Sequence, residues 1–277
     1  MTAVSNQVIR GWIEQFHRDG FLVVPSVLSG EQCAQLRLDL AAAYRAKGRK
    51  SGVLKRLFEN SRANLELFWQ EPIVTFAERL IADNGSDEVH YGEDLQAYSK
   101  GLPSANEVHV IHNNGFVIRA ESAGLGDSSW HQDDTPHITS LDGRPLENVR
   151  LNVLAITCLY YLTDVLDVEH GPTQAIRGSH LFGVHCTNER AERHTGAVLS
   201  ALGTEGTCVI VNNQTWHRGA PNQSKEHRQV TQVTYAKRLI GHKYGSFMNY
   251  QMPEHVWKNG FASKASFSAF SILKSTA

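Results

Sequence analysis

The sequence predicts a mainly β protein with flanking helices, in which antiparallel strands form a sandwich or barrel. Three observations support this fold class. Apolar residues recur at helical spacing over about the first hundred residues. After about residue 105 the spacing changes to two, which is typical of strands. The later strand candidates are joined by turns and not by regular helices, which argues against a Rossmann-type sheet.

The first part of the chain is expected to fold into helices around one short strand. Val8, Trp12 and Phe16 share one helical face, and Gly20 ends the pattern. Ser29 is a suitable N-cap for the next helix. The expected elements are a helix over 6–20, a strand over 21–25, and helical stretches over 29–48 and 64–85.

The second part contains the strand candidates. Residues 107–121 are interpreted as two extended runs around the turn dipeptide Asn114-Gly115. Further strands are expected within 149–165, 206–213 and 228–239. The segment from Gly241 to the end is aromatic but irregular, and it is expected either to cover a cavity mouth or to form an oligomer contact.

Composition excludes several function classes. The formal net charge of -1 gives no reason to expect nucleic acid or a membrane surface as a partner. No CxxC pair occurs, and no apolar run approaches the length of a membrane span. The start of the chain has no secretory signal pattern, so we expect a cytoplasmic protein with reduced thiols. Histidine, the commonest protein ligand of transition metals, is abundant with 14 copies.

One short motif combines two metal ligands. His131 and Asp133, in the sequence WHQD, are two residues apart and would project from the same face of an extended chain. His217 is the best third ligand, because it follows a predicted strand and precedes a glycine and a proline. Two imidazoles and one carboxylate suit non-haem Fe(II) with open positions. Zinc is chemically possible too, although no HExxH helix supports a zinc hydrolase.

An arginine on the next strand suggests an anionic cosubstrate. Arg228 begins a predicted strand and shares one face with Val230, Gln232 and Thr234. A guanidinium that faces the metal would hold a dicarboxylate through two hydrogen bonds. A 2-oxo acid could chelate iron with its near end while its far carboxylate meets Arg228. Thr173 could add a hydroxyl donor to that carboxylate.

These residues resemble the phytanoyl-CoA dioxygenase family of Fe(II)/2-oxoglutarate oxygenases, over most of the chain. The similar motifs are the N-terminal EQFHRDGFLVVPSVLSGEQCAQLR, then WHQD, HGPTQAIRGSH, and WHRGAPNQS followed by Arg228. The resemblance implies a double-stranded β-helix, or jelly roll, in a single domain over 1–277. That domain would comprise a helix-rich part over about 1–100, a core over about 105–240 and a tail over 241–277.

The resemblance also implies residue roles. His131, Asp133 and His217 would bind iron, and Arg228 and Thr173 would hold 2-oxoglutarate. Arg177 occupies a position where the family often has proline, so it serves either the substrate or only the surface. Asp134 should point away from the metal and is assigned no ligand role. Related halogenases replace the carboxylate by a small residue, so the retained Asp133 favours hydroxylation or a related oxidation.

The expected reaction is hydroxylation of an unactivated C–H bond of a small molecule, with O2 consumed and 2-oxoglutarate converted to succinate and CO2. One alternative is the same oxidative chemistry ending in desaturation, cyclisation or epimerisation, as in natural-product biosynthesis. Another class remains open, a non-catalytic jelly-roll protein that binds a metal or small ligand. A homodimer is weakly favoured by the apolar stretch at 261–273.

Candidates for the substrate pocket lie near the expected ligands. Trp130 and Trp216 precede ligands in sequence, but they would equally pack around the metal. His112 and Asn114 lie at the expected turn. Fold and motif do not choose a substrate. The candidate set is His112, Arg119, Trp130, His137, Arg177 and Trp216.

Overall fold

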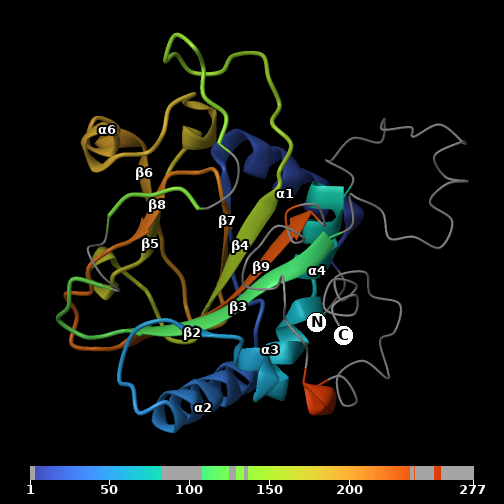
Figure 1. Cartoon of the computed structure of the whole chain (residues 1–277), viewed down its shortest axis with the longest axis vertical. Coiled ribbons are helices and arrows are strands. Elements are labelled where there is room, and N and C mark those ends of the chain that lie inside the picture. The colour runs from blue at the N-terminus through green and yellow to red at the C-terminus, as the bar shows by residue number, and fades with distance from the viewer. Residues whose placement is uncertain are drawn as a thin grey trace, which may run out of the picture.

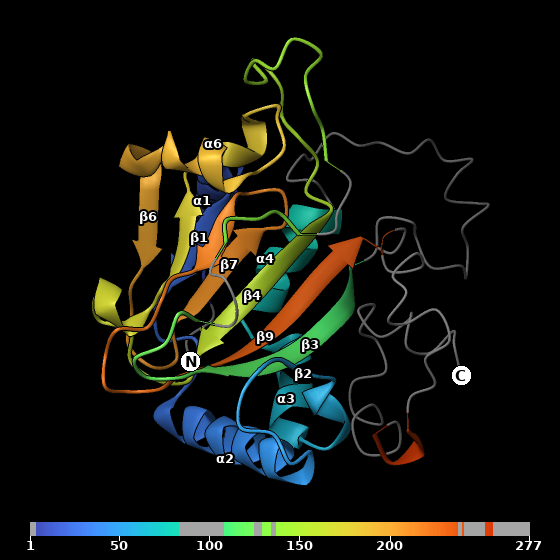
Figure 2. The ribbon, with the colours of Figure 1, turned by 60° about the vertical axis from the view of Figure 1, so that its left-hand side comes forward.

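The computed structural model describes residues 4–82, 108–124, 129–133, 137–237, 240 and 253–256, which include two antiparallel sheets (Figures 1 and 2). The larger sheet has the strand order β1-β7-β4-β9-β3-β2, and the smaller has the order β6-β5-β8. The strands are β1 Phe21–Val24, β2 Leu54–Lys55, β3 Val108–Ile118, β4 Ala155–Tyr161, β5 Thr173–Ile176, β6 Val198–Ala201, β7 Cys208–Asn212, β8 His217–Gly219 and β9 Arg228–Lys237.

Helices cover the outer face of the large sheet and form the main core with it. Ser5 caps the first helix by accepting a hydrogen bond from Val8 N–H, and Gly20 ends it in the left-handed conformation. No helix in the described ranges is both long and apolar enough to cross a membrane. The α-helices are α1 Asn6–Asp19, α2 Gly30–Ala46, α3 Arg62–Glu66, α4 Ile73–Ala77 and α6 Asn188–Glu192. Short helical turns are η1 Leu57–Glu59, η2 Leu67–Trp69, η3 Glu78–Ala82, η4 Val168–His170, η5 Ser179–Leu181 and η6 Thr195–Ala197.

The helical stretch expected over 64–85 is divided into short pieces. α3 and η2 end before Gln70, and α4 begins after Pro72, which occupies its N-cap position. Proline has no backbone N–H and cannot continue the hydrogen-bond pattern of a preceding helix. The helical spacing of apolar residues predicts helix over this stretch, and Pro72 explains why the helix is interrupted between η2 and α4. Residues 83–85 lie outside the described part.

The predicted turn at Asn114-Gly115 is wrong. β3 runs straight through both residues, and Gly115 pairs with Thr231 of β9 and with Leu54 of β2. A side chain at position 115 would place its Cβ 2.4 Å from a methyl carbon of Leu57. Glycine is therefore needed here because η1 packs closely onto the strand, and not because the chain reverses.

A second, smaller core lies between the two sheets. Ala201 of β6 packs against apolar residues of β3, β4, β7 and β9. This cluster consists of Phe116, Ile118, Leu159, Tyr161, Val165, Ala201, Val209, Val211 and Val230. It fills one end of the space between the sheets and leaves the polar residues described below at the other.

Candidate metal centre

Backbone pairing brings the three predicted ligands together. The N–H groups of His131 and His217 each donate to the other residue's carbonyl oxygen at 3.0 Å. Asp133 N–H donates to the carbonyl of Asn213, also at 3.0 Å. The segment carrying His131 and Asp133 thus lies alongside β8 and the end of β7. Asp134 lies outside the described residues.

The donor atoms converge on one point. One ligand atom from each of His131, Asp133 and His217 lies within 4.8 Å of the other two. The carboxylate Oδ1 of Asp133 is 4.0 Å from His131 Nε2 and 3.8 Å from His217 Nε2. Donors sharing one ion at bonds of about 2.1 Å lie about 3 Å apart in an octahedral arrangement. A closure of about one ångström would therefore accommodate an ion.

Both imidazoles present the correct nitrogen. His131 Nδ1 lies 3.0 Å from the carbonyl of Ser129, and His217 Nδ1 lies 2.8 Å from that of Thr215. A carbonyl only accepts, so Nδ1 carries the proton and Nε2 keeps a lone pair for a metal. Burial lowers the pKa of His217, an effect that the neighbouring Asp133 carboxylate partly offsets. The donor set therefore fits a transition metal of the kind held by two histidines and one carboxylate.

Arg228 carries a buried positive charge. Only 3% of its surface is exposed, its Nη1 donates to the carbonyl of Gly171, and its guanidinium carbon lies 5.7 Å from the ring centroid of Tyr161. Its Nε has no hydrogen-bond partner, and burial lowers the pKa of Arg228. Among the described residues no carboxylate pairs with it. A buried guanidinium without a carboxylate partner has the chemistry to bind an anion.

The distance between Arg228 and the triad suits a short dicarboxylate. A Cβ at Gly219 would lie 3.7 Å from Arg228 Nη2, and Gly219 is two residues beyond His217 on β8. Two residues of strand span about 7 Å, which is of the order of the length of a five-carbon dicarboxylate. Thr173, buried and paired with Gly219, starts the neighbouring strand β5. Its N–H donates to the hydroxyl of Tyr161 at 3.1 Å.

A row of polar residues continues the inner face of the large sheet beyond the apolar cluster. The Thr157 hydroxyl lies 3.1 Å from both Asn213 Oδ1 and Thr234 Oγ1. His112 pairs with Thr234 across the sheet, and its Nδ1 is 3.3 Å from Asn114 Nδ2. Sequence reasoning missed Tyr161, Thr157 and Asn213. A threonine at an alternate position of the apolar strand β4 was the available signal for Thr157.

The two tryptophans do not line the metal cavity. Trp130 and Trp216 each precede a ligand directly, so in extended backbone they face the other way. They pack together with Ile176 and Ala191 on the outer side of the small sheet. The structure therefore places both tryptophans on the face opposite to the ligand side chains of His131 and His217.

The other substrate candidates also have different surroundings. Arg177 lies 3.6 Å from the buried carboxylate of Asp19, which gives it a structural partner. Arg119 is exposed just beyond β3. His137 contacts Gln214 at 3.1 Å and the ring of His185. Of the substrate candidates, His112 lies next to the polar row, together with Asn114 on the same face of β3.

The fold and the donor set define a jelly-roll protein with a two-histidine, one-carboxylate metal motif. The family model for phytanoyl-CoA dioxygenase (PhyH) matches residues 16–230, and the chain belongs to this family. The family resemblance seen in the sequence is thereby confirmed. An ectoine dioxygenase of Stutzerimonas stutzeri is 28% identical over 196 residues, covering 66% of this chain and 54% of that protein. One of Halomonas elongata is 27% identical over 186 residues, covering 66% and 49%. The chain spans about half the length of these relatives.

Solved structures confirm the predicted fold. HygX from Streptomyces hygroscopicus, in a crystal structure with nickel and 2-oxoglutarate bound, superposes with a TM-score of 0.60 at 16% identity. That match covers 85% of this chain and 88% of HygX. The 2-oxoglutarate-dependent epimerase SnoN from nogalamycin biosynthesis superposes with a TM-score of 0.53 at 20% identity, covering 84% of each chain.

Proposed function

We propose that the protein is an Fe(II)- and 2-oxoglutarate-dependent oxygenase that hydroxylates an unactivated C–H bond of a small molecule. One observation carries the proposal: a buried, carboxylate-free Arg228 lies beside the strand that presents His217 to Asp133 and His131. A metal-binding protein without a cosubstrate would gain nothing from a buried guanidinium there. Membership of the phytanoyl-CoA dioxygenase family supports the same reading.

The residues divide the work by position. His131, Asp133 and His217 would hold the metal on one side and leave its other side open. Arg228 would bind the far carboxylate of 2-oxoglutarate, with the Thr173 hydroxyl as a second donor. The bound Fe(II) and 2-oxoglutarate supply the oxidising chemistry, in which O2 and 2-oxoglutarate give succinate, CO2 and an oxygen atom for the substrate. The apolar cluster between the sheets would exclude water from the end of the inter-sheet space that it fills.

A second outcome of the same chemistry is a separate candidate. The structural neighbours include an epimerase and a carbocyclase, both described as 2-oxoglutarate-dependent. Desaturation, cyclisation or epimerisation would use the same metal and cosubstrate residues. Analysis of the product's mass distinguishes them, because hydroxylation adds one oxygen atom to the substrate and these outcomes add none.

The test is an anaerobic titration of the protein with Fe(II) and 2-oxoglutarate, followed by visible absorbance. A 2-oxo acid chelated to Fe(II) gives a weak charge-transfer band. We expect the band in the wild type and its loss in Asp133→Ala and Arg228→Ala. Arg119→Ala is the matched control, because this exposed arginine lies beyond the end of β3 and should leave the band unchanged.

The outcomes separate the classes of function. A band that survives Arg228→Ala at equal 2-oxoglutarate would contradict the cosubstrate role of Arg228. A folded wild type without any band would favour the non-catalytic metal- or ligand-binding protein. With the band established, oxygen uptake would screen substrates, beginning with ectoine because both curated relatives are named for it.

The cellular setting stays a prediction from the sequence. We propose a cytoplasmic enzyme that acts on a small molecule and has neither nucleic acid nor a membrane as partner. A homodimer through the stretch at 261–273 is also proposed, and that stretch lies outside the described residues. Light scattering that gives a single species of monomer mass would refute the dimer.

A further inference from the structure

We infer that Arg218 and Trp130 form a clasp on the outer side of the small sheet that sets the relative positions of the two histidine ligands. The inference rests on the proposed function, because it concerns the same metal centre. His131 and His217 are directly opposite each other across a two-residue bridge. Their neighbours Trp130 and Arg218 are therefore opposite each other as well, on the other face.

The two side chains are in contact. The Arg218 guanidinium carbon lies 4.8 Å from the ring centroid of Trp130, within the range of a cation–π interaction. Arg218 Nε donates to Gln174 Oε1 at 2.8 Å, and Gln174 Nε2 donates to Ser200 Oγ at 3.1 Å. Gln174 also pairs with Arg218 across β5 and β8. The outer face thus carries a continuous row of contacts directly behind the ligands.

The clasp lies at the edge of the apolar cluster in which Trp130 packs with Ile176, Ala191 and Trp216. A cavity of about 430 Å3 lies over the row, between the small sheet and α6 (Figure 2 shows α6 above the sheet). Trp130, Gln174 and Arg218 all line it. By contrast, the side chain of Trp216, the residue before His217 in the sequence, is fully buried. Because Arg218 lines this cavity, its contacts with Trp130 and Gln174 hold its guanidinium against the outer face of β8.

The segment of His131 is attached at several points. Its backbone is joined to β8 by the two bonds with His217 and to Asn213 through Asp133 N–H, and Trp130 N–H donates to Asn188 Oδ1 at 2.9 Å. The side chain of Gln132 bonds to Gln214 and Cys186, so the contact between Arg218 and Trp130 acts on the Trp130 side of His131. The side chain of His131 is itself half exposed. A small shift of this segment would change the separation of the two imidazoles, to which metal geometry is sensitive. Arg218 and Trp130 are therefore positioning residues and not ligands.

The experiment measures Co(II) binding to the metal-free protein by anaerobic calorimetry, together with the visible spectrum of bound Co(II). Residues that orient metal ligands typically cost 10- to 100-fold in affinity when replaced. We expect Arg218→Leu to weaken Co(II) binding by about 10-fold and to alter the spectrum. Arg218→Lys, which keeps the charge over the ring, should restore part of the affinity.

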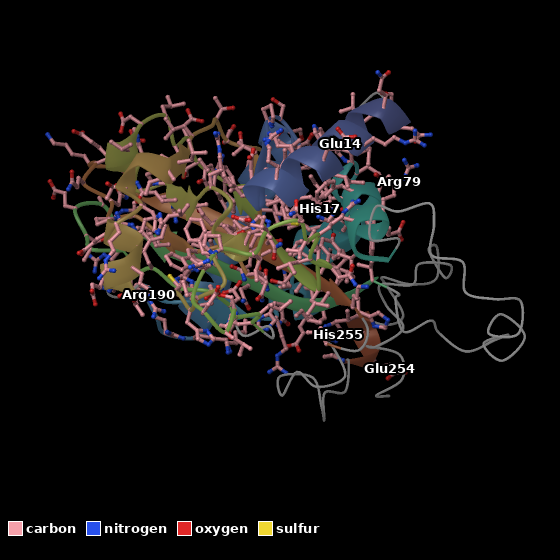
Figure 3. All side chains as sticks on the ribbon, turned by 90° about the horizontal axis from the view of Figure 1, so that it is seen from above. Glu14, His17, Arg79, Arg190, Glu254 and His255 are labelled. Carbon is pink, nitrogen blue, oxygen red and sulfur yellow. The ribbon has the colours of Figure 1, made fainter. Side chains whose placement is uncertain are left out.

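A double-mutant cycle tests whether the two residues act as a pair. If they do, Arg218→Leu combined with Trp130→Leu weakens binding no more than the worse single variant. Arg190→Leu is the matched control, because Arg190 lies on α6 (Figure 3) and its side chain donates to the carbonyl of His185. It should leave both affinity and spectrum unchanged. The thermal midpoint of each metal-free variant separates a general loss of stability from an effect on the site.

Two results would overturn the inference. One is an unchanged Co(II) affinity and spectrum in Arg218→Leu, and the other is a double variant that loses the full product of the two single effects. If the leucine variants do not fold, Gln174→Met and Arg218→Lys replace them, since each loosens the clasp and keeps a cation at position 218. Unchanged Co(II) binding in both of these variants would equally refute the inference. His217→Ala must abolish binding in the same assay. If His217→Ala binds Co(II) like the wild type, the metal site of the proposed function is refuted. If His217→Ala loses binding and the clasp variants bind normally, the metal site stands and this inference is refuted.

Discussion

Replacing Arg228 by methionine should weaken cosubstrate binding strongly and change the stability of the metal-free protein much less. The guanidinium is buried, pairs with no carboxylate in the described part of the chain, and leaves Nε without a hydrogen bond. Exchanging a buried ion for an apolar side chain of similar size is often neutral or stabilising, by about 1–4 kcal/mol. The carbonyl of Gly171 loses its donor, which costs about 1–3 kcal/mol. The sum runs from a loss of about 2 to a gain of about 3 kcal/mol, so the metal-free variant should be at most about 2 kcal/mol less stable than the wild type.

The effect on 2-oxoglutarate follows from the bonds that are lost. Two hydrogen bonds from a charged donor contribute about 1.5–3 kcal/mol each, so the dissociation constant should rise at least about 100-fold. With nickel bound and 2-oxoglutarate at 100 times its wild-type dissociation constant, the wild type should gain about 2.7 kcal/mol of unfolding free energy. Under the same conditions the Arg228→Met variant should gain only about 0.4 kcal/mol.

Urea unfolding with and without nickel and 2-oxoglutarate measures both quantities. Arg37→Met is the control, because Arg37 pairs with Glu205 at the surface and should leave the gain from 2-oxoglutarate intact. A variant less stable than the wild type by more than about 2 kcal/mol without ligand would refute the view that this charge is uncompensated. A full gain with 2-oxoglutarate would refute Arg228 as the carboxylate clamp.

Three further predictions concern other parts of the molecule. His131→Ala should lower Co(II) affinity at least about 100-fold in calorimetry while the metal-free melting point holds, and unchanged affinity would remove His131 from the ligand set. Gly171→Ala should cost about 1–3 kcal/mol in urea unfolding, because φ is +66° and a Cβ would lie 2.8 and 2.9 Å from two backbone oxygens; wild-type stability would contradict this. Burial, Arg150 and His180 lower the pKa of His17 to about 4 (Figure 3). Between pH 6.5 and 4 the unfolded chain therefore binds a proton that the folded one does not. The free energy of unfolding should therefore fall by about 1–2 kcal/mol as the pH is lowered through this window, allowing for partial exposure. The fall should be smaller in His17→Gln, and an equal fall in that variant would contradict this assignment.

Alternation along extended chain accounts for most of what the sequence could predict. It placed His131 and Asp133 on one face, and it placed Arg228, Gln232 and Thr234 on another. The structure brings the first pair to one point with His217, and it aligns the second set along the inner side of β9. These predictions need only the local backbone, so they require no knowledge of which strands are neighbours.

The remaining features depend on contacts between segments that are distant in sequence. Arg177 pairs with Asp19, at the end of α1, and no spacing rule connects the two. Gly115 is explained by the approach of η1, whereas the same Asn-Gly dipeptide is the commonest signal of a hairpin. A glycine required for close packing and a glycine required for a turn are identical in sequence. Only the strand pairing distinguishes them.

The position of the two tryptophans behind the ligands has a physical reason that also indicates which residues face the metal. In extended backbone the immediate neighbours of a ligand point away from the metal, and the residues two positions away share its face. Two residues before each histidine, the carbonyls of Ser129 and Thr215 accept the Nδ1 protons. The backbone therefore selects the tautomer of both ligands, while the side chains serve other contacts: the Thr215 hydroxyl donates to the carbonyl of Gly20, and the Ser129 hydroxyl accepts from Asn188. The immediate neighbours lie on the opposite face of the extended chain, where the side chains of Trp130 and Arg218 are in contact. Each short motif around a ligand thus specifies two layers, one facing the metal and one bracing the strand that carries it.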